Sequence, residues 1–479
     1  MAKEESKENK ISIYGIIRII LFLVLVVISS ILYYSVLKTG MLPNKYIALL
    51  VVVLLVINLV VGLFIKAKKK WLNVIGFILL IIFSGAFSVG TSYINKTMKI
   101  LENFVSQNEE RTTYYVLTRK GVYTDISELD GKVVGILNQE ADLLKEELDK
   151  KAKLEYKEYA SMGDLLYGLE LNEIDAIVVS STIYEYVTEE NVDLKELLEK
   201  IDEVDVVGKS SEITSNIDVG NSFLVYISGL DTRDTSAVAP YGLSDVNIVV
   251  AVNPDSHRVL LVHIPRDYYV YVYNRPQMKD KLTHAGLYGI ESSIKTVANI
   301  FDINIDTYVK VNFKALTTIV DSIDGIDVYS DTDFQSSHIK TWHVNKGMNH
   351  MDGAKALAYS RERYAYATGD RHRGQNQNDV IQAIISKVSQ SPNYLMKYDQ
   401  ILNSMQPYFT TNFEMNDVQQ LIKEQVDKMA KWKVESISVN GSNGSNYTAS
   451  WPNQLTYVMI PNQSTIDTAK AKISEVMRS

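Results

Sequence analysis

The sequence predicts an α/β protein in three parts: three N-terminal transmembrane helices, a small α/β accessory domain, and a larger α/β domain with a mixed sheet flanked by helices. Two observations predict this class. The first 95 residues hold three long apolar runs, whereas the rest alternates short apolar strands with amphipathic helices. We therefore place the three parts at residues 1–95, 96–215 and 216–479.

The apolar runs are Ile13–Leu37, Tyr46–Ile65 and Trp71–Tyr93. Each reaches about the 20 helical residues that cross a bilayer core of about 30 Å. The first run is too long for a cleavable signal peptide, and two further spans follow it. The sequence therefore predicts a multi-pass protein of the cell membrane.

The lysines predict how the chain crosses the membrane. The tail before the first span carries three lysines and the second connection, KAKKK, carries four, whereas the first connection holds only Lys38 and Lys45. The positive-inside rule places the tail and the second connection in the cytoplasm. Everything after about residue 95 is then expected outside the cell.

Composition excludes some classes of function. The chain has no cysteine, so a long extracellular part must bury its core without disulfides, as suits a Gram-positive type of surface. The formal net charge of −8 argues against general nucleic-acid binding, which normally uses a basic face.

The accessory domain begins with a predicted helical stalk, Asn95–Glu110, and then alternates strands and helices, which favours a largely parallel sheet. The acidic stretch EENVDLKELLEK is interpreted as a solvated helix face. The expected strands are Tyr114–Leu117, Lys132–Leu137, Leu154–Tyr159 and Asp175–Ser180, and the expected helices are Gln139–Lys151 and Ser161–Leu171.

The larger domain has the same alternation, with Gly441–Tyr447 (GSNGSNY) predicted as a flexible turn. Its expected strands are Phe223–Ser228, Val246–Val252, Arg258–Ile264, Tyr268–Tyr273, Val434–Val439 and Tyr457–Ile460. Its expected helices are Glu291–Ile300, Phe313–Ser322, Met351–Tyr359, Gln375–Gln390 and Asn416–Lys431.

A cluster of arginines is the most informative feature of this domain. Two like charges about 4 Å apart repel by about 4 kcal/mol at an effective dielectric constant of about 20, so such a cluster needs water, carboxylates or an anion. Glu362 and Asp370 offset only part of the charge. Guanidinium groups match phosphate oxygens in bidentate fashion, which favours a phosphate or pyrophosphate ligand over a merely solvated loop. The cluster comprises Arg361, Arg363, Arg371 and Arg373 in the run SRERYAYATGDRHRGQNQ.

Acidic residues at strand ends suggest a metal site. Asp231 follows one predicted strand and Asp245 begins the next, so the two can converge at one edge of a sheet. Mg²⁺ (or Mn²⁺) binds one or two carboxylates together with phosphate oxygens and water. Taken singly, each aspartate is better explained by turn or cap chemistry than by metal binding.

Four motifs together carry a family resemblance: GLDTR, SDVNI, HIPRD and YSRERYAYATGDRHRGQNQ. They resemble the motifs of the LytR–CpsA–Psr family, and the order of spans and domains resembles its capsule-associated, CpsA-like members. The resemblance implies an enzyme, a phosphotransferase-type glycopolymer–peptidoglycan transferase. The donor would be a polyprenyl-pyrophosphate-linked glycan, with capsular polysaccharide favoured, and the acceptor would be peptidoglycan. Magnesium as cofactor and other capsule-assembly proteins as partners are further expectations.

The resemblance also assigns roles to residues. Asp231 and Asp245 match the metal-associated aspartates, and many members carry an arginine where this chain has Leu243. Asn376 likewise stands where arginine is frequent. Arginines 266, 361, 363 and 373 are expected to be catalytic, and the pyrophosphate-binding set is Arg266, Arg361, Arg363, Arg371, Arg373 and Gln377.

Other candidate residues are left open. Asp234 or Asp267 is a hypothetical base for the acceptor, and each is equally open to a structural role. The spacing of His338, His343 and His350 follows no common zinc pattern. His284 is interpreted as a loop residue near the pocket rather than as a general base.

Three competing functions make different predictions. A non-enzymatic membrane regulator of capsule biosynthesis or transcription would need a larger cytoplasmic part than this topology predicts. A receptor acting through the accessory domain would not need the arginines. A glycosidase with paired carboxylates would act without lipid pyrophosphate or metal.

Overall fold

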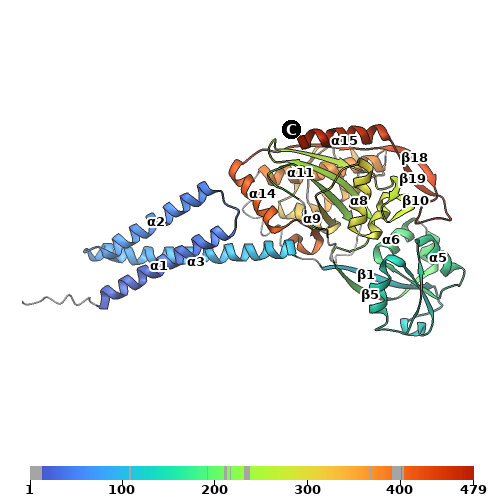
Figure 1. The fold of residues 1–479 in the computed structure, drawn as a ribbon, viewed down its shortest axis with the longest axis horizontal. Helices are drawn as coiled ribbons and strands as arrows, with labels where there is room; N and C mark the ends of the chain where they lie inside the picture. The colour runs from blue at the N-terminus through green and yellow to red at the C-terminus, as the bar shows by residue number, and fades with distance from the viewer. Residues whose placement is uncertain are drawn as a thin grey trace, which may run out of the picture. The chain divides into compact units, whose positions relative to one another are not determined.

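The computed structural model describes residues 13–106, 109–190, 192–209, 213–215, 217–230, 238–366, 369–390, 401 and 404–478 (Figure 1). The chain divides into two compact units. One comprises Met1–Asn103 and Met415–Met429, and the other comprises Phe104–Glu414 and Ala430–Ser479.

The first unit contains α1 (Ile13–Lys38), α2 (Asn44–Lys66) and α3 (Lys70–Ser106), together with α14 (Met415–Lys428). The first three helices are long and apolar enough to cross a membrane, which confirms the three predicted apolar spans. Helix α3 continues into the predicted stalk as one helix of 37 residues, and no proline interrupts it.

The predicted accessory region forms a five-stranded sheet of order β3-β2-β4-β1-β5. Strands β3, β2 and β4 are parallel, but β1 runs antiparallel to β4 and β5. The prediction of a largely parallel sheet is therefore correct only for β3, β2 and β4. The bounds are β1 (Glu109–Arg119), β2 (Val133–Leu137), β3 (Glu155–Tyr159), β4 (Ala176–Ser180), β5 (Leu198–Lys209), α4 (Ala141–Leu148), α5 (Met162–Glu170), α6 (Ser181–Glu190) and α7 (Val192–Leu197).

Strand β5 corrects the sequence analysis. The stretch EENVDLKELLEK was interpreted as helical throughout, yet α7 ends at Leu197 and β5 begins at Leu198. From there the strand pairs with the whole length of β1 and buries Val204 and Val206 on one face. This long-range pairing outweighs the helical preference of the acidic residues.

The second sheet has six strands in the order β16-β11-β6-β7-β8-β17. β11 is parallel to β6 and β17 is parallel to β8, whereas the other neighbours are antiparallel, so the predicted mixed sheet is confirmed. The bounds are β6 (Phe223–Leu230), β7 (Ser244–Asn253), β8 (Arg258–His263), β11 (Thr307–Asn312), β16 (Phe409–Thr411) and β17 (Lys433–Ser438).

Helices cover both faces of this sheet. Side chains such as Tyr226 and Val249 pack with α8 (Ile290–Phe301) and α15 (Gln463–Arg478), while Ile227 points to the opposite face. That second face meets α9 (Phe313–Ser322) and α11 (Asp370–Gln390).

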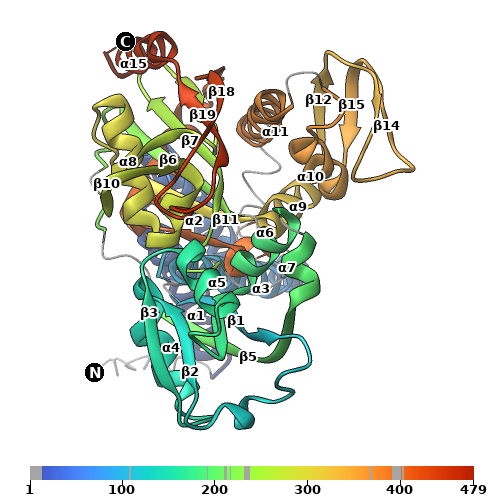
Figure 2. The same cartoon turned by 90° about the vertical axis from the view of Figure 1, so that its right-hand side faces the viewer.

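Beyond α11 lie two further strands and α10 (Gly353–Arg361). Figure 2 shows α11 between the six-stranded sheet and the hairpin of β12 (Ile326–Ser330) and β15 (Gly347–Met351). The remaining short elements are β9 (Tyr269–Val272), β10 (Arg275–Lys281), β13 (Phe334–Gln335), β14 (His343–Val344), β18 (Gly441–Asn446), β19 (Thr456–Pro461) and the 3₁₀ segments Ile126–Leu129, Asn138–Glu140, Leu282–Tyr288 and Gln406–Tyr408.

Most predicted elements of the larger domain are present, with two exceptions that matter here. The predicted flexible turn Gly441–Tyr447 is wrong, because Gly441–Asn446 forms β18 and pairs with β19. Helix α11 begins at Asp370, five residues before the predicted start at Gln375, and therefore carries Arg373.

Candidate functional site

Several strand ends meet at one edge of the six-stranded sheet. Leu230, the last residue of β6, pairs with Ser244 at the start of β7 and with Asn312 at the end of β11. His263, the last residue of β8, pairs with Ile248 of β7. The carboxyl ends of β6, β8 and β11 thus share an edge with the start of β7, as in other ligand sites of α/β sheets.

Asp245 is the central carboxylate of this edge. It is buried, its Oδ2 lies 2.7 Å from Arg266 Nη1, and its Oδ1 accepts a hydrogen bond of 3.2 Å from Thr283 Oγ1. Burial alone raises the pKa of Asp245, but the Arg266 and Arg373 guanidiniums outweigh burial and hold this pKa below its usual range. The carboxylate is therefore ionised at neutral pH.

A buried polar network fixes the start of β7. Tyr226 donates a hydrogen bond of 2.5 Å to Asn247 Oδ1, and Asn247 Nδ2 donates one of 2.7 Å to the Ser244 carbonyl. Ser244 also hydrogen-bonds to Ser228, with 2.8 Å between the hydroxyl oxygens. Asn247 belongs to the SDVNI motif, so this motif positions Asp245 as well as supplying it.

The N-terminal turns of α11 lie against the end of β8. Gly374 packs on the His263 ring so closely that a Cβ at this position would overlap the ring. Burial and, to a lesser extent, the neighbouring Arg373 lower the pKa of His263 to about 4, although a hydrogen bond with Gln377 acts in the opposite direction. Arg373 and Gln377 therefore reach the same edge as Asp245.

The loop after α10 has a different arrangement. Glu362 is fully buried, and its carboxylate accepts from Ser337 N and Oγ, both at 2.8 Å, and from the N–H groups of Tyr364 and Ala365. Burial raises the pKa of Glu362, but these donors hold it below its usual range. Glu362 thus stabilises the loop, rather than neutralising the arginines as the sequence analysis supposed.

The two arginines that flank Glu362 point in different directions. Arg361 lies over the Phe313 ring, 4.9 Å from its centroid. Arg363 is exposed, donates a hydrogen bond of 2.7 Å to Tyr364 Oη and lies over the same tyrosine ring. Arg361 thereby contacts the cavity wall described next, whereas Arg363 faces solvent.

An apolar cavity of about 260 Å³ lies between the sheet and helices α9 and α11. Strand residues such as Ile227 and Val246 form one wall, and Ile381 and Ile384 of α11 form another. Phe313 and Gln377 also line the cavity, so it lies next to both Arg361 and the α11 arginine. An apolar chain can therefore lie beside a cationic site.

The predicted site residues thus fall into three groups. Asp245, Arg266, Arg373 and Gln377 come together at the sheet edge, and Arg361 borders the cavity. Arg363 lies at neither place, because it donates a hydrogen bond to Tyr364. Asp231, Asp234 and the side chain of Arg371 lie outside the described residues.

Two positions that depart from the family pattern are structural here. Leu243 is buried in an apolar cluster with Leu287. Asn376 is also buried, and its Nδ2 donates to the Tyr359 carbonyl at 3.0 Å and to Tyr366 Oη at 3.2 Å. Neither side chain is placed to contact an anion.

Asp267, the second hypothetical base, and His284, which was predicted to be a loop residue near the pocket, each have a partner in the structure. Asp267 lies 3.5 Å from Lys281 Nζ and 3.7 Å from Arg266 Nε. His284 is fully buried, and its Nδ1 lies 2.6 Å from Asp280 Oδ1. These contacts favour a structural role for both residues.

Three histidines considered for zinc have separate partners. His343 and His350 pair with Asp333 and Asp327, at 2.7 and 2.8 Å, and His338 lies 3.2 Å from the Arg361 carbonyl. Within the part of the chain that the structure describes, no group of three or more His, Cys, Asp or Glu side chains could hold a metal ion.

Sequence reasoning missed His263 and Thr283. His263 opens the HIPRD motif, and Thr283 lies in KLTHAGLYG, where only His284 drew attention. Their positions beside Arg373 and Asp245 depend on pairing between distant segments. No local pattern could have identified them.

Comparison with known proteins identifies the family. The LytR_cpsA_psr family profile matches residues 181–474, more than half of the chain. The chain belongs to the LytR–CpsA–Psr family. This membership confirms the resemblance carried by the four motifs.

Relatives of the chain agree with this membership. Over 257 residues the chain is 31% identical to the polyisoprenyl-teichoic acid–peptidoglycan teichoic acid transferase TagU of Enterococcus faecalis, covering 53% of this chain and 83% of that protein. The TagU of Bacillus cereus is 32% identical over 222 residues, 45% of this chain and 70% of that protein.

Solved structures of family members are also similar to the chain. B. subtilis TagV covers 54% of this chain and 98% of its own, with 26% identity and a TM-score of 0.45. The LytR-CPS2A-psr family protein YwtF (TagT), solved with octaprenyl pyrophosphate bound, covers 55% and 94%, with 26% identity and a TM-score of 0.42.

Proposed function

We propose that this protein transfers a glycopolymer from a polyprenyl-pyrophosphate carrier to peptidoglycan at the outer face of the membrane. One observation carries the proposal: an ionised, arginine-paired carboxylate and the Arg373 guanidinium share a sheet edge beside an apolar cavity. A diphosphate joined to a hydrocarbon chain has the matching chemistry. Family membership and the transferase activity named for the relatives support the proposal.

The arginines would hold the pyrophosphate. Each charge-assisted hydrogen bond contributes about 1.5–3 kcal/mol, so a few of them suffice to bind a dianionic head group firmly. Arg266 and Arg373 already lie at the site, and Arg361 lies at its border. Arg363 and Arg371 remain proposed ligands, and Arg363 would have to leave Tyr364 to take part.

Mg²⁺ (or Mn²⁺) is the proposed metal, with Asp245 and Asp231 as its carboxylate ligands. Asp245 fits this role because it is ionised and presents hard oxygen atoms. When bound, the metal would neutralise charge that develops on the phosphate oxygens.

The proposed reaction is a phosphoryl transfer. A sugar hydroxyl oxygen of peptidoglycan attacks the phosphorus that bears the glycopolymer, and a new O–P bond forms. The P–O bond to the polyprenyl phosphate breaks, and the polyprenyl phosphate leaves with the electron pair. The hydroxyl proton passes to a base, for which Asp234 remains a hypothesis and Asp267 is disfavoured by its ion pairs. Positioned guanidiniums stabilise the charge that develops at the transferred phosphoryl group.

Capsular polysaccharide is the proposed polymer. Residues 1–180 lie outside the segment that the family profile matches, and they include the three apolar helices and strands β1 to β4 of the five-stranded sheet. This extra architecture supports a polymer other than the teichoic acid named for the relatives. The lysine distribution supports the extracellular placement of the site.

Reconstitution tests the function. The full chain in proteoliposomes would be incubated with a defined polyprenyl-pyrophosphoryl glycan, Mg²⁺ and soluble peptidoglycan strands. Mass spectrometry should report a glycan–peptidoglycan conjugate, with release of polyprenyl phosphate. Parallel reactions with capsular and teichoic donors decide the polymer. Absence of conjugate with both donors, while both still bind, would reject the proposed reaction.

A further inference from the structure

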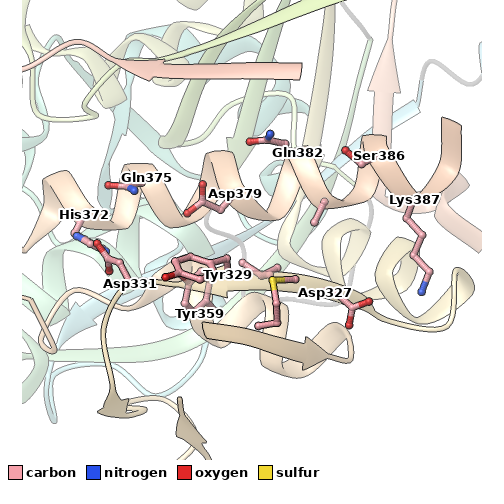
Figure 3. A pocket seen from close by; sticks show the side chains of 13 residues that line it. Asp327, Tyr329, Asp331, Tyr359, His372, Gln375, Asp379, Gln382, Ser386 and Lys387 are labelled. Atoms are coloured by element: carbon pink, nitrogen blue, oxygen red, sulfur yellow. The ribbon is translucent and has the colours of Figure 1, made fainter. Parts of the chain in front are cut away.

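A second and larger hollow lies on the other side of α11. It is a groove of about 730 Å³ between α11 and the β12–β15 hairpin (Figure 3). His372, Asp379 and Lys387 contribute from the helix, and Tyr329 and Asp331 contribute from the hairpin side. Unlike the apolar cavity, this groove is lined by polar and aromatic side chains.

One helix separates the groove from the apolar cavity. Gln377, Ile381 and Ile384 of α11 face the cavity, whereas Asp379 and His372 face the groove. His372 directly precedes Arg373, so the groove begins beside the cationic site. A ligand lying in the groove can therefore reach the position proposed for the pyrophosphate without entering the apolar cavity.

The floor of the groove is an exposed aromatic and apolar surface. Tyr329 of β12 pairs in register with Met348 of β15, and these side chains are 57% and 65% exposed. A tyrosine ring held rigidly by a strand gives a flat surface with a polar tip. Such a surface suits the apolar face of a sugar ring.

Asp379 is an uncompensated carboxylate in this groove. Its side chain points from α11 toward the hairpin (Figure 3), and within the described residues no hydrogen bond or ion pair satisfies it. Burial raises the pKa of Asp379 to about 6, and the nearby Asp331 adds to this effect. A half-buried carboxylate without a partner is costly, so it favours a ligand that donates hydrogen bonds.

The charge of the groove indicates which ligand that is. Asp327, Asp331 and Asp379 line it, whereas Lys387, its one described cation besides histidine, donates to the carbonyl oxygens of Asp324 and Gly325. An anionic polymer would meet like charges here. A chain that carries hydroxyl and amide N–H groups and has no charge along its backbone would not be repelled.

We propose that this groove binds the acceptor, the N-acetylated sugar backbone of peptidoglycan, and presents its hydroxyl to the site beside Arg373. This inference rests on the proposed transfer function. Hydroxyl and acetamido N–H groups donate to Asp379 and Asp331, and a sugar ring stacks on Tyr329. The donor's tail and head group occupy the other side of α11, so both substrates bind at once.

Binding and kinetics of the full chain in detergent micelles test the groove. The probe is chitopentaose, an uncharged pentamer of N-acetylglucosamine, and the donor-side ligand is polyprenyl pyrophosphate without glycan. Asp379→Asn and Tyr329→Ala each remove one groove contact, and the exposed residues Asp255 and Tyr447 give the matched controls Asp255→Asn and Tyr447→Ala. Thermal melting checks that all variants fold.

Both groove variants should weaken chitopentaose binding by about tenfold, the loss expected for one charge-assisted hydrogen bond or one stacked ring. They should raise the KM for peptidoglycan strands by a similar factor, leaving kcat and carrier affinity within about twofold of wild type. Arg373→Ala should show the reverse pattern, losing the carrier and keeping the pentamer.

Several results would overturn the groove assignment. The assignment is wrong if the wild-type protein does not bind chitopentaose. It is also wrong if the groove variants bind chitopentaose as tightly as the control variants do. A loss of affinity for a glycan-bearing donor but not for the bare carrier would assign the groove to the donor instead. Failure of the transfer reaction is distinguishable, because pentamer binding would still follow the pattern above.

Discussion

Arg266 and Asp245 form a buried ion pair of 2.7 Å between the segment after β8 and the start of β7. Their side chains are 15% and 8% exposed, so water screens the pair only weakly. The pair holds one guanidinium at the sheet edge before any ligand arrives. It also keeps ionised the carboxylate that is the proposed metal ligand.

Breaking this pair should destabilise the protein. Asp245→Asn leaves Arg266 as a buried charge with a weaker partner, and we expect a loss of about 3–5 kcal/mol, the range for removing one partner of a buried pair. The pKa of Asp245 is lower in the folded state, so the pair's contribution is complete above about pH 4 and is lost as the pH falls through the folded pKa.

Unfolding of wild type and variant at several pH values checks this expectation. The stability difference should be largest near neutral pH and should close in acid. Asp302→Asn, which removes the exposed carboxylate that pairs with Lys470 at 2.7 Å, serves as the control and should be nearly neutral. Equal effects of the two substitutions would contradict the buried-pair argument.

Removing Arg373 should abolish transfer without unfolding the protein. Arg373 lies within electrostatic reach of both Asp245 and His263, at the point proposed for the pyrophosphate. Loss of one such guanidinium is expected to reduce transfer about 10³-fold or more. Mass-spectrometric detection of the conjugate gives the measurement. Arg258→Ala, at the opposite end of β8 from His263, removes the pairings with Glu475 and Glu435 and should keep full activity. Transfer by Arg373→Ala at the same rate as by Arg258→Ala would mean that the site is misplaced.

His263 should make the protein sensitive to mild acid. Its folded pKa of about 4 lies below the ordinary value of about 6.5, so the unfolded chain binds a proton first as the pH falls. The stabilising effect of the neutral, buried ring is complete above about pH 6.5 and decreases to zero near pH 4. This loss amounts to about 3 kcal/mol.

The measurement is apparent stability across that pH range. His263→Gln should flatten the dependence, whereas replacement of the exposed His350 by glutamine should leave the dependence unchanged. A wild-type curve as flat as that of His263→Gln would mean that folding does not lower the pKa of His263.

The sequence placed Asp245 at the end of an apolar strand, where strand ends share a sheet edge, and the family resemblance placed Arg266 in the same site. It could not predict that Arg363 faces Tyr364, since that contact depends on a loop fixed by buried Glu362. The cavity was equally unpredictable, because its walls come from segments as distant as Ile227 and Ile384. The same holds for β5 and β18, which exist only through their pairing partners.

Gly374 is expected to tolerate no side chain. A Cβ there would overlap the His263 ring, which is buried and cannot move aside freely. Gly374→Ala should therefore shift the start of α11 and displace Arg373, reducing transfer by at least about tenfold and destabilising the fold by about 1–3 kcal/mol. Gly220→Ala is the control, since a Cβ at 220 meets only ordinary contacts. Unchanged transfer and stability in Gly374→Ala would contradict the close packing.

Filling the apolar cavity should separate binding of the lipid tail from binding of the head group. Ile384 lines the cavity from α11, and tryptophan at this position would occupy much of the roughly 260 Å³. Each CH₂ group kept out of the cavity loses about 0.8 kcal/mol, so exclusion of a few carbons weakens the carrier by about tenfold or more. Binding of inorganic pyrophosphate should change by less than about twofold, because the arginines are untouched. Ser386→Trp, on the groove side of the same helix, controls for bulk on α11 and should leave carrier affinity unchanged. If Ile384→Trp weakened pyrophosphate and carrier equally, the cavity would not hold the tail, and the damage would lie at the arginine site instead.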